Sequence, residues 1–267
     1  MDTVQTITEK MIASKEGGIG WITFNNPARH NAVSMSMWEA LPVILDDYAS
    51  DPAIRVVILK GAGEKAFVSG ADISEFKEKR SSKEASAAYN TASDAATHAL
   101  KNFPKPTIAM IRGYCYGGGA GIAVSCDLRI ASDDSSYSIP AGKLGVGYRY
   151  DGIKRLTDLV GPQFTMEIFY TARRFSAQEA LAMGLINRML PVAELESYTR
   201  EYATTIAGNA PLTIAAVKRS VLEYMKADRE RDVAAVNRMV DACFASEDFI
   251  EGRDAFMQKR KPAFKGR

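Results

Sequence analysis

A run of glycines placed directly after a buried-type strand most restricts how this chain can fold. The apolar segment Thr107–Ile111 (TIAMI) is followed by Gly113–Ala123 (GYCYGGGAGIA), which leads into a helix of small residues. Glycine lets backbone N–H groups approach a ligand where a Cβ would obstruct, and free amides at a helix N-terminus can hold a phosphate or a developing oxyanion. A tight turn with close helix–sheet packing uses the same residues. The run therefore predicts a strand–turn–helix unit and leaves its purpose open.

The run differs from two phosphate-binding loops that also rely on glycine. It follows the third or fourth expected strand rather than the first, and no ribose-binding acid lies at the spacing of a dinucleotide site. No Gly-Lys-Ser/Thr triplet follows it, which excludes a Walker loop. A nucleotide-binding domain of either type is therefore not expected.

A second glycine-centred turn lies earlier in the chain. Lys65–Ile73 (KAFVSGADI) follows the apolar run Arg55–Lys60 (RVVILK) and also leads toward a helix. Asp72 is suited to cap that helix, and Glu75 is a weaker candidate for chemistry because the helix dipole alone favours an acid there. Two turns that present backbone amides in one α/β domain can also converge on one atom. Two converging amides form an oxyanion hole.

The rest of the chain divides into an α/β part and a helical part. Up to about residue 138, short apolar runs alternate with stretches of helical periodicity, which predicts βαβ units and a sheet covered on both faces. From residue 152 onward helices dominate. We expect a core domain over 1–195 and a helical C-terminal oligomerisation region over 196–267. The expected strands are Met11–Ser14, Gly20–Phe24, Arg55–Lys60, Thr107–Ile111 and Leu128–Ala131, and the expected helices are Met35–Tyr48, Lys83–Lys101, Ala177–Met183, Val192–Gly208, Pro211–Lys226 and Asp232–Ala245.

The composition indicates a soluble globular protein. Of 267 residues 46% are hydrophobic. The chain has 34 basic and 32 acidic side chains, which gives a net charge of +2. This balance gives no field that would attract nucleic acid, and no apolar run approaches the ~18 residues that span a bilayer. The polar, acid-containing N-terminus resembles neither a signal nor a transit peptide, so we expect a cytoplasmic protein. Three cysteines without CxxC spacing and two histidines predict neither a disulfide scaffold nor a metal site.

Four ordered motifs together resemble the crotonase superfamily, the enoyl-CoA hydratase/isomerase family. The resemblance implies a crotonase-like ββα spiral core and a homotrimer or dimer of trimers whose C-terminal helices cross to neighbouring subunits. It also implies acyl-CoA thioester substrates, with coenzyme A as part of the substrate and no separate cofactor. The motifs are Phe24–Ala32 (FNNPARHNA), Lys65–Ile73 (KAFVSGADI), Gly113–Ala131 (GYCYGGGAGIAVSCDLRIA) and Ala255–Lys265 (AFMQKRKPAFK).

The resemblance assigns roles to individual positions. The amides of Ala71 and Gly118 match the family's oxyanion hole. Phe256 and Lys259 match residues that a neighbouring subunit lends to the adenine and 3′-phosphate of CoA, and five of the last nine residues are basic. A solvated terminus is the other interpretation of that basic tail. The remaining positions that match CoA contacts are Ala28, Arg29, Lys65, Ser69 and again Ala71.

The sequence departs from the family at both acids of the familiar hydration mechanism. Hydration of a 2-enoyl thioester needs a base that activates water and an acid that protonates the α-carbon. The family's hydratases carry these two glutamates at positions that match Gly121 and Ala141 here. Neither glycine nor alanine can move a proton. Small residues at both places also enlarge the acyl pocket.

The loop Gly147–Gly152 is the natural place to search for replacements. Asp151 could act as a base, Tyr148 or Tyr150 as a proton donor, and the planar fork of Arg149 could bind a substrate carboxylate. Capping of a following helix by Asp151 and a surface ion pair of Arg149 are the other interpretations. Tyr116 either faces the acyl chain or packs in the core. Asp127 and Arg129 are expected to form a structural ion pair.

Three hypotheses remain. The first is an enzyme of enoyl-CoA hydratase type that stabilises an enolate with Ala71 and Gly118. The second keeps the fold but decarboxylates or isomerises an acyl-CoA, since decarboxylation yields the enolate without a base. The third is a catalytically inactive CoA-thioester-binding protein.

Overall fold

Two β-sheets form the framework of the protein. The computed structural model describes residues 5–72 and 83–267. A seven-stranded sheet has the order β1-β2-β3-β4-β6-β8-β11, and a four-stranded sheet has the order β10-β9-β7-β5. The large sheet consists of β1 (Gln5–Thr8), β2 (Met11–Glu16), β3 (Ile19–Phe24), β4 (Val56–Gly61), β6 (Thr107–Ile111), β8 (Leu128–Ser132) and β11 (Arg188–Leu190); the small sheet consists of β5 (Ala66–Val68), β7 (Tyr114–Tyr116), β9 (Ser136–Ser138) and β10 (Phe175–Ser176).

The large sheet begins as a hairpin and continues as parallel strands. β2 and β3 pair antiparallel around Gly17 and Gly18, which both have positive φ, so the first two expected strands form a hairpin. From β3 onward, neighbouring strands are parallel. Parallel strands need crossover connections, and helices supply them here.

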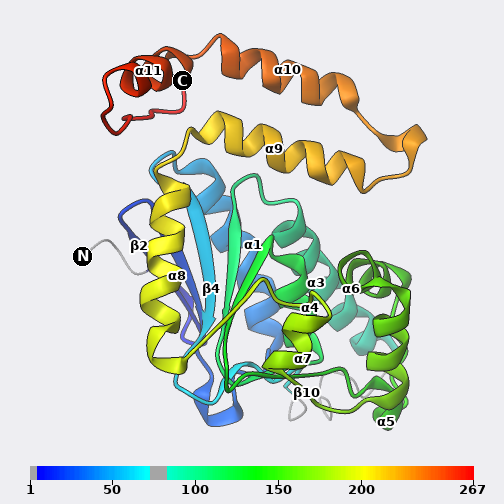
Figure 1. Cartoon of the computed structure of the whole chain (residues 1–267). Helices are drawn as coiled ribbons and strands as arrows, with labels where there is room; N and C mark the ends of the chain where they lie inside the picture. The colour runs from blue at the N-terminus through cyan, green and yellow to red at the C-terminus, as the bar shows by residue number, and fades with distance from the viewer. Residues whose placement is uncertain (1–4, 73–82) are drawn as a thin grey trace.

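The large sheet is covered on both faces, as the sequence predicted. Successive side chains of a strand point to opposite faces. Val57 of β4 belongs to the core cluster shared with α1 (Met35–Ser50), whereas Val56 packs with Leu195 of α8 (Val192–Ala207). Figure 1 shows α8 on one side of the sheet and α1, α3 (Lys83–Lys101) and α4 (Gly118–Ser125) on the other.

A ββα repeat builds both sheets together. After a strand of the large sheet, the chain adds a strand to the small sheet and then enters a helix. β6, β7 and α4 form one such unit, and β8, β9 and α5 (Ala141–Leu144) form the next. β5, β7 and β9 are mutually parallel for this reason. The expected ββα spiral core is therefore confirmed.

Three helices after the core form a separate layer at one end of the molecule. α9 (Pro211–Tyr224) runs across the end of the core, and α10 (Val233–Phe244) and α11 (Glu247–Met257) follow on its outer side (Figure 1). Lys218 ties α9 to the core through Asp127 at 2.7 Å. The boundary expected at residue 195 falls inside α8, which packs on the large sheet.

Two local expectations were wrong. Asp127 pairs with Lys218, and the buried Arg129 guanidinium instead donates to the carbonyl oxygens of Leu185 at 2.7 Å and Cys126 at 2.8 Å, so the two residues do not pair with each other. The helix after the polar loop, α6, begins before Asp151 rather than after it. The remaining helices of the described residues are α6 (Tyr150–Thr171), α7 (Ala177–Ala182) and the short η1 (Pro27–Arg29) and η3 (Asp228–Glu230). Within the described residues, no helix combines the length and apolar character of a membrane span.

Candidate active site

The loop after β3 is held by one buried asparagine. The amide of Asn31 donates to the carbonyl oxygens of Ala62 at 2.9 Å and Ala66 at 2.7 Å, and its side-chain oxygen accepts the N–H of Asn26 at 3.0 Å. Asn31 has φ 56°, in the left-handed region that asparagine tolerates better than most residues. These bonds hold the first motif against the start of the second motif and the residues just before it.

The same two motifs form a parallel bridge that orients Ala71. The N–H of Val33 donates to Gly70 at 2.8 Å, and the N–H of Asp72 donates to Val33 at 2.9 Å. Successive amides of extended backbone point in opposite directions, so the N–H of Ala71, between these two bonds, points away from Val33. It donates no hydrogen bond to any described residue.

The glycine run brings α4 against this turn. Gly117 has φ 49° and ψ −112°, a conformation open to glycine alone, and Gly118 is the first residue of α4. A Cβ on Gly119 would lie 2.1 Å from the carbonyl oxygen of Val68, so only glycine permits this approach. A Cβ on Gly118 would lie 3.8 Å from the amide nitrogen of Ala71. The two turns are thus in contact, and the N–H of Gly118, like that of Ala71, has no acceptor in the described part of the chain.

The two positions at which the family resemblance predicts acids differ in their surroundings. Gly121 lies one helical turn after Gly118, on the same face of α4. Apart from the chain neighbours and the backbone of its own helix, no described residue has an atom within 4 Å of a Cβ built there. Ala141 begins α5 and is 6% exposed within the core. Among the described residues, therefore, nothing packs against the Cβ position of Gly121, whereas Ala141 is packed.

The candidate replacement residues lie together at the start of α6. Asp151 is exposed in the first turn of this helix, and the N-cap residue is Arg149, which makes no side-chain cap. The cap interpretation of Asp151 is therefore wrong. Arg149 pairs with Asp94 of α3 at 2.9 Å, and both side chains are exposed. This contact matches the expected surface ion pair and engages one nitrogen of the guanidinium.

Tyr148 and Tyr116 are fixed by aromatic neighbours. Tyr148 meets Phe169 edge-on at 4.9 Å between ring centroids, and burial of the phenol raises its pKa although 36% of the residue remains exposed. Tyr116 stacks on Tyr114 at 5.1 Å, and its hydroxyl shares a hydrogen bond of 3.0 Å with Ser136 of β9. The Tyr148 hydroxyl therefore stays protonated at neutral pH, because burial disfavours the phenolate.

The expected CoA contacts divide into two groups. Ala28 and Arg29 lie in η1, and the Ser69 hydroxyl donates to the carbonyl oxygen of Arg29 at 3.3 Å. Arg29 also lies 3.8 Å from Asp72, and Lys65 is exposed just before β5. These residues gather beside the Ala71 turn.

Phe256 and Lys259 form the second group, at the far end of the chain. Phe256 is 83% exposed on α11, and Lys259 follows the helix with φ 54°. Figure 1 places α11 at the opposite end of the core from α4 and α7. One chain therefore does not bring these two residues to the first group. The tail itself is not a loose terminus, because Asp248 accepts the N–H groups of Lys265 at 2.6 Å and Gly266 at 2.8 Å.

Among the described residues, the side chains for a cysteine nucleophile or a metal centre are not grouped at this site. Burial raises the pKa of Cys115, and it raises the pKa of Cys126 to about 12, so both thiols stay protonated. Among the described residues no three His, Cys, Asp or Glu side chains are grouped to hold a metal ion. Glu75 lies outside the described residues.

Sequence reasoning missed one pair of residues behind the two turns. Trp38 of α1 and Tyr89 of α3 are both buried, and the indole N–H donates to the Tyr89 hydroxyl at 2.8 Å. A Cβ on Gly118 would lie 3.5 Å from Trp38 Cζ2. The apolar faces of both helices indicate burial, but they do not identify this partnership.

The ββα spiral, with two glycine-centred turns in contact, defines an α/β protein of one recognisable class. The family model described as enoyl-CoA hydratase/isomerase matches residues 14–267, and the chain belongs to this family. It is 34% identical over 258 residues to a short-chain-enoyl-CoA hydratase of Clostridium acetobutylicum, covering 96% of this chain and 98% of that protein. It is also 34% identical over 265 residues to a carnitinyl-CoA dehydratase of Escherichia coli K12, covering 98% and 100%.

Solved structures agree with this assignment. An enoyl-CoA hydratase/carnithine racemase from Magnetospirillum magneticum superposes with a TM-score of 0.91 at 32% identity, covering 97% of each chain. An enoyl-CoA hydratase from Bacillus anthracis also has a TM-score of 0.91, at 31% identity, covering 97% of this chain and 100% of that one. The crotonase-like fold expected from the motifs is therefore confirmed.

Proposed function

We propose that the protein is an acyl-CoA-processing enzyme of enoyl-CoA hydratase type. The thioester carbonyl is held by the amides of Ala71 and Gly118, and the negative charge that develops on its oxygen is stabilised there as an enolate. The observation that carries this proposal is the contact between the two turns, with both N–H groups lacking an acceptor among the described residues. Preorganised donors of this kind stabilise charge that appears only in the transition state.

Proton transfer must come from groups other than the family's two glutamates. Asp151 and Tyr148 are the side chains that we assign to it, since both lie at the start of α6. Decarboxylation or isomerisation on the same hole is the alternative. The pair between Arg149 and Asp94 weighs against Arg149 as a carboxylate site for decarboxylation, because Asp94 already neutralises part of the charge that would attract a substrate carboxylate.

The first test is the loss of enoyl-thioester absorbance when the purified protein meets crotonyl-CoA. Loss with a 3-hydroxyacyl product supports hydration, and Asp151→Asn and Tyr148→Phe then test the proton path. Binding without loss, on any enoyl chain length, overturns hydration. Release of CO₂ from malonyl-CoA or a double-bond shift without water addition would identify the alternative reactions, and CoA binding without any turnover would identify a binding protein.

A pair of substitutions tests the hole itself. Gly118 is the first residue of α4, a position where proline is tolerated because no intrahelical partner awaits its N–H. Gly118→Pro removes that donor and should lower kcat by about 10²–10³, as loss of one oxyanion donor does elsewhere. Gly118→Ala keeps the N–H and places its Cβ at ordinary contact distance from Trp38, so it serves as the matched control. Equal activity of both variants would refute the role of this amide.

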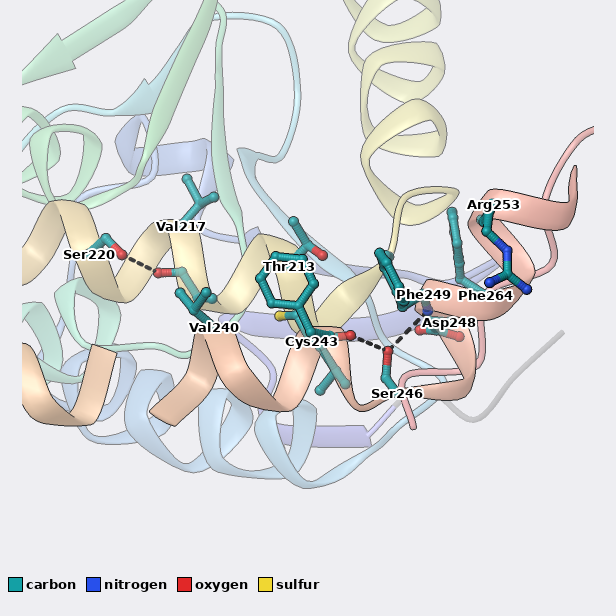
Figure 2. A pocket seen from close by; sticks show the side chains of 15 residues that line it. Thr213, Val217, Ser220, Val240, Cys243, Ser246, Asp248, Phe249, Arg253 and Phe264 are labelled. Atoms are coloured by element: carbon teal, nitrogen blue, oxygen red, sulfur yellow. Dashed lines mark hydrogen bonds between the residues drawn. The ribbon is translucent and has the colours of Figure 1, made fainter. Parts of the chain in front are cut away.

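We also propose that the active unit is a homotrimer or a dimer of trimers. A groove of ≈ 560 Å³ lies between α9, α10 and α11. Its lining is mainly apolar, with side chains such as Val217, Val240 and Phe249 (Figure 2). Phe244, Phe256 and Met257 add exposed apolar surface to the same helices. A neighbouring copy would cover this surface and bring its Phe256 and Lys259 to the CoA site. Light scattering should give the mass of three or six chains, and a monomer at micromolar concentration would refute this proposal.

A further inference from the structure

The buried pair of Trp38 and Tyr89 adjoins both turns that carry the oxyanion donors. We propose that this pair is a positioning device that fixes the N–H groups of Ala71 and Gly118 in their converging geometry. The inference rests on the proposed oxyanion hole. Neither side chain is proposed to transfer a proton or to touch the substrate.

A hydrogen bond joins the two side chains in the core. The indole N–H of Trp38 donates to the Tyr89 hydroxyl at 2.8 Å, and the rings meet edge-on with centroids 6.4 Å apart and an interplanar angle of 88°. Trp38 is 2% exposed and Tyr89 is 4% exposed. A buried N–H that loses its acceptor carries the full cost of desolvation, so this bond fixes both rings.

Tyr89 reaches the Ala71 side of the hole through one carbonyl group. Its hydroxyl donates to the carbonyl oxygen of Val33 at 3.4 Å. The same oxygen accepts the N–H of Asp72 at 2.9 Å, which is one of the two bonds on either side of Ala71. The direction of the Ala71 amide therefore depends on the position of Val33, and Tyr89 helps to hold that position.

Trp38 reaches the Gly118 side through packing. Its Cζ2 lies 3.5 Å from the Cβ position of Gly118, and the amide nitrogen of Ala71 lies 3.8 Å from the same point. A shift of the indole would therefore leave the first turn of α4 without support. Donors aimed at a developing charge lose effect when they move by a fraction of an ångström, because catalysis depends on preorganised geometry.

The test compares Tyr89→Phe with Tyr48→Phe. Tyr48 is also buried and lies in the same helix as Trp38, but its hydroxyl bonds with Ser14 and Trp21 in the β2–β3 hairpin. Both variants delete one buried hydroxyl, so losses of stability should be similar. The readout is the red shift in the absorbance of bound cinnamoyl-CoA, which reports polarisation of the thioester carbonyl. Affinity for free CoA, measured by calorimetry, reports the rest of the site.

Tyr89→Phe should reduce the red shift and lower kcat for crotonyl-CoA by about tenfold, less than the 10²–10³ for a deleted donor. The Kd for free CoA should stay within about twofold, since free CoA has no thioester carbonyl for the two amides to hold. Tyr48→Phe should leave both the shift and kcat at the wild-type values. An unchanged red shift in Tyr89→Phe, or an equal loss in both variants, would overturn the inference.

Two further outcomes keep the inference separate from the proposed function. A wild-type protein that binds cinnamoyl-CoA without a red shift has no working oxyanion hole, and both proposals then fail together. A wild-type shift that persists in Tyr89→Phe refutes the positioning pair alone. If Tyr89→Phe does not fold, Trp38→Phe removes the same hydrogen bond from the other side, and the same reduction of the red shift is expected.

Discussion

Lys259 combines a backbone conformation that favours glycine with a proposed role that requires a cation. Its φ of 54° lies in the left-handed region, and it ends α11 in a turn in which the N–H of Arg260 donates to Ala255 at 3.0 Å. Glycine is the usual residue at this position, and a side chain in the left-handed conformation costs roughly 1–2 kcal/mol. The unfolded chain gains freedom with glycine, which offsets about 0.5–1 kcal/mol. Lys259→Gly should therefore stabilise the protein by about 0.5–1 kcal/mol, or raise Tm by roughly 1–4 °C.

The same substitution should weaken CoA binding if a neighbouring subunit uses Lys259 to hold the 3′-phosphate. A hydrogen bond to a charged group contributes about 1.5–3 kcal/mol, so the affinity for CoA should fall at least about tenfold. The affinity for 3′-dephospho-CoA should not change. Lys259→Ala is the matched control, because it removes the cation but keeps the strained backbone. It should lose the same affinity without the gain in Tm.

Thermal unfolding measures the effect on stability, and calorimetry measures the affinity for CoA. Both are done at one protein concentration, since the Tm of an oligomer depends on concentration. A glycine variant that binds CoA as tightly as the wild type would refute the phosphate contact. A glycine variant no more stable than Lys259→Ala would refute the argument from backbone strain.

Three further predictions concern the glycine run, the tail and the polar loop. Gly121→Ala should raise stability by about 0.5–1 kcal/mol, because helix propensity improves and no described atom obstructs the methyl group. Gly119→Ala should lower stability by about 1–3 kcal/mol or more, because its Cβ meets the Val68 carbonyl oxygen. Denaturant unfolding that shows the same sign for both variants would contradict this. A hydrogen bond with Arg260 lowers the pKa of Glu251 to about 2. Glu251 therefore contributes stability above its unfolded pKa of about 4.5, and this stability is lost as the pH falls toward 2. Proteolysis of the C-terminal tail should accelerate over that range in the wild type and be fast at all pH values in Glu251→Gln. Asp94→Asn should change stability by less than about 0.5 kcal/mol because its pair with Arg149 is exposed, and a larger change in urea unfolding would show that the pair is structural.

Local sequence pattern was sufficient to predict most helices and strands of the core. The runs at Thr107–Ile111 and Lys83–Lys101 have the expected bounds in the structure, because an unbroken apolar run and a helical period are properties of the segment itself. The short strands of the small sheet are only two or three residues long, too short for any period to show. Their existence follows from pairing between segments distant in the chain.

Partnerships over long sequence distances could not be predicted for the same reason. Asp127 and Arg129 are neighbours in sequence, yet Lys218 and the Leu185 carbonyl oxygen are their partners. Trp38 and Tyr89 are 51 residues apart. The motifs located the two turns because each turn is encoded locally by glycine. The support behind the turns depends on how α1 and α3 pack, and no motif records that.

The proposed donors of the hole belong to the main chain, and this affects how the protein can change over generations. Every amino acid except proline supplies the same N–H group. Most replacements at Ala71 would keep the donor, although a larger side chain there must still fit. If the proposed hole operates, the side chains around it can be exchanged without removing the two donors, and glycine and alanine at the positions expected for the family's acids would be an example. A saturation screen at residue 71 should therefore find small residues functional and proline inactive. Sequence comparison alone would undervalue such a position, because selection acts on an atom that nearly every substitution retains.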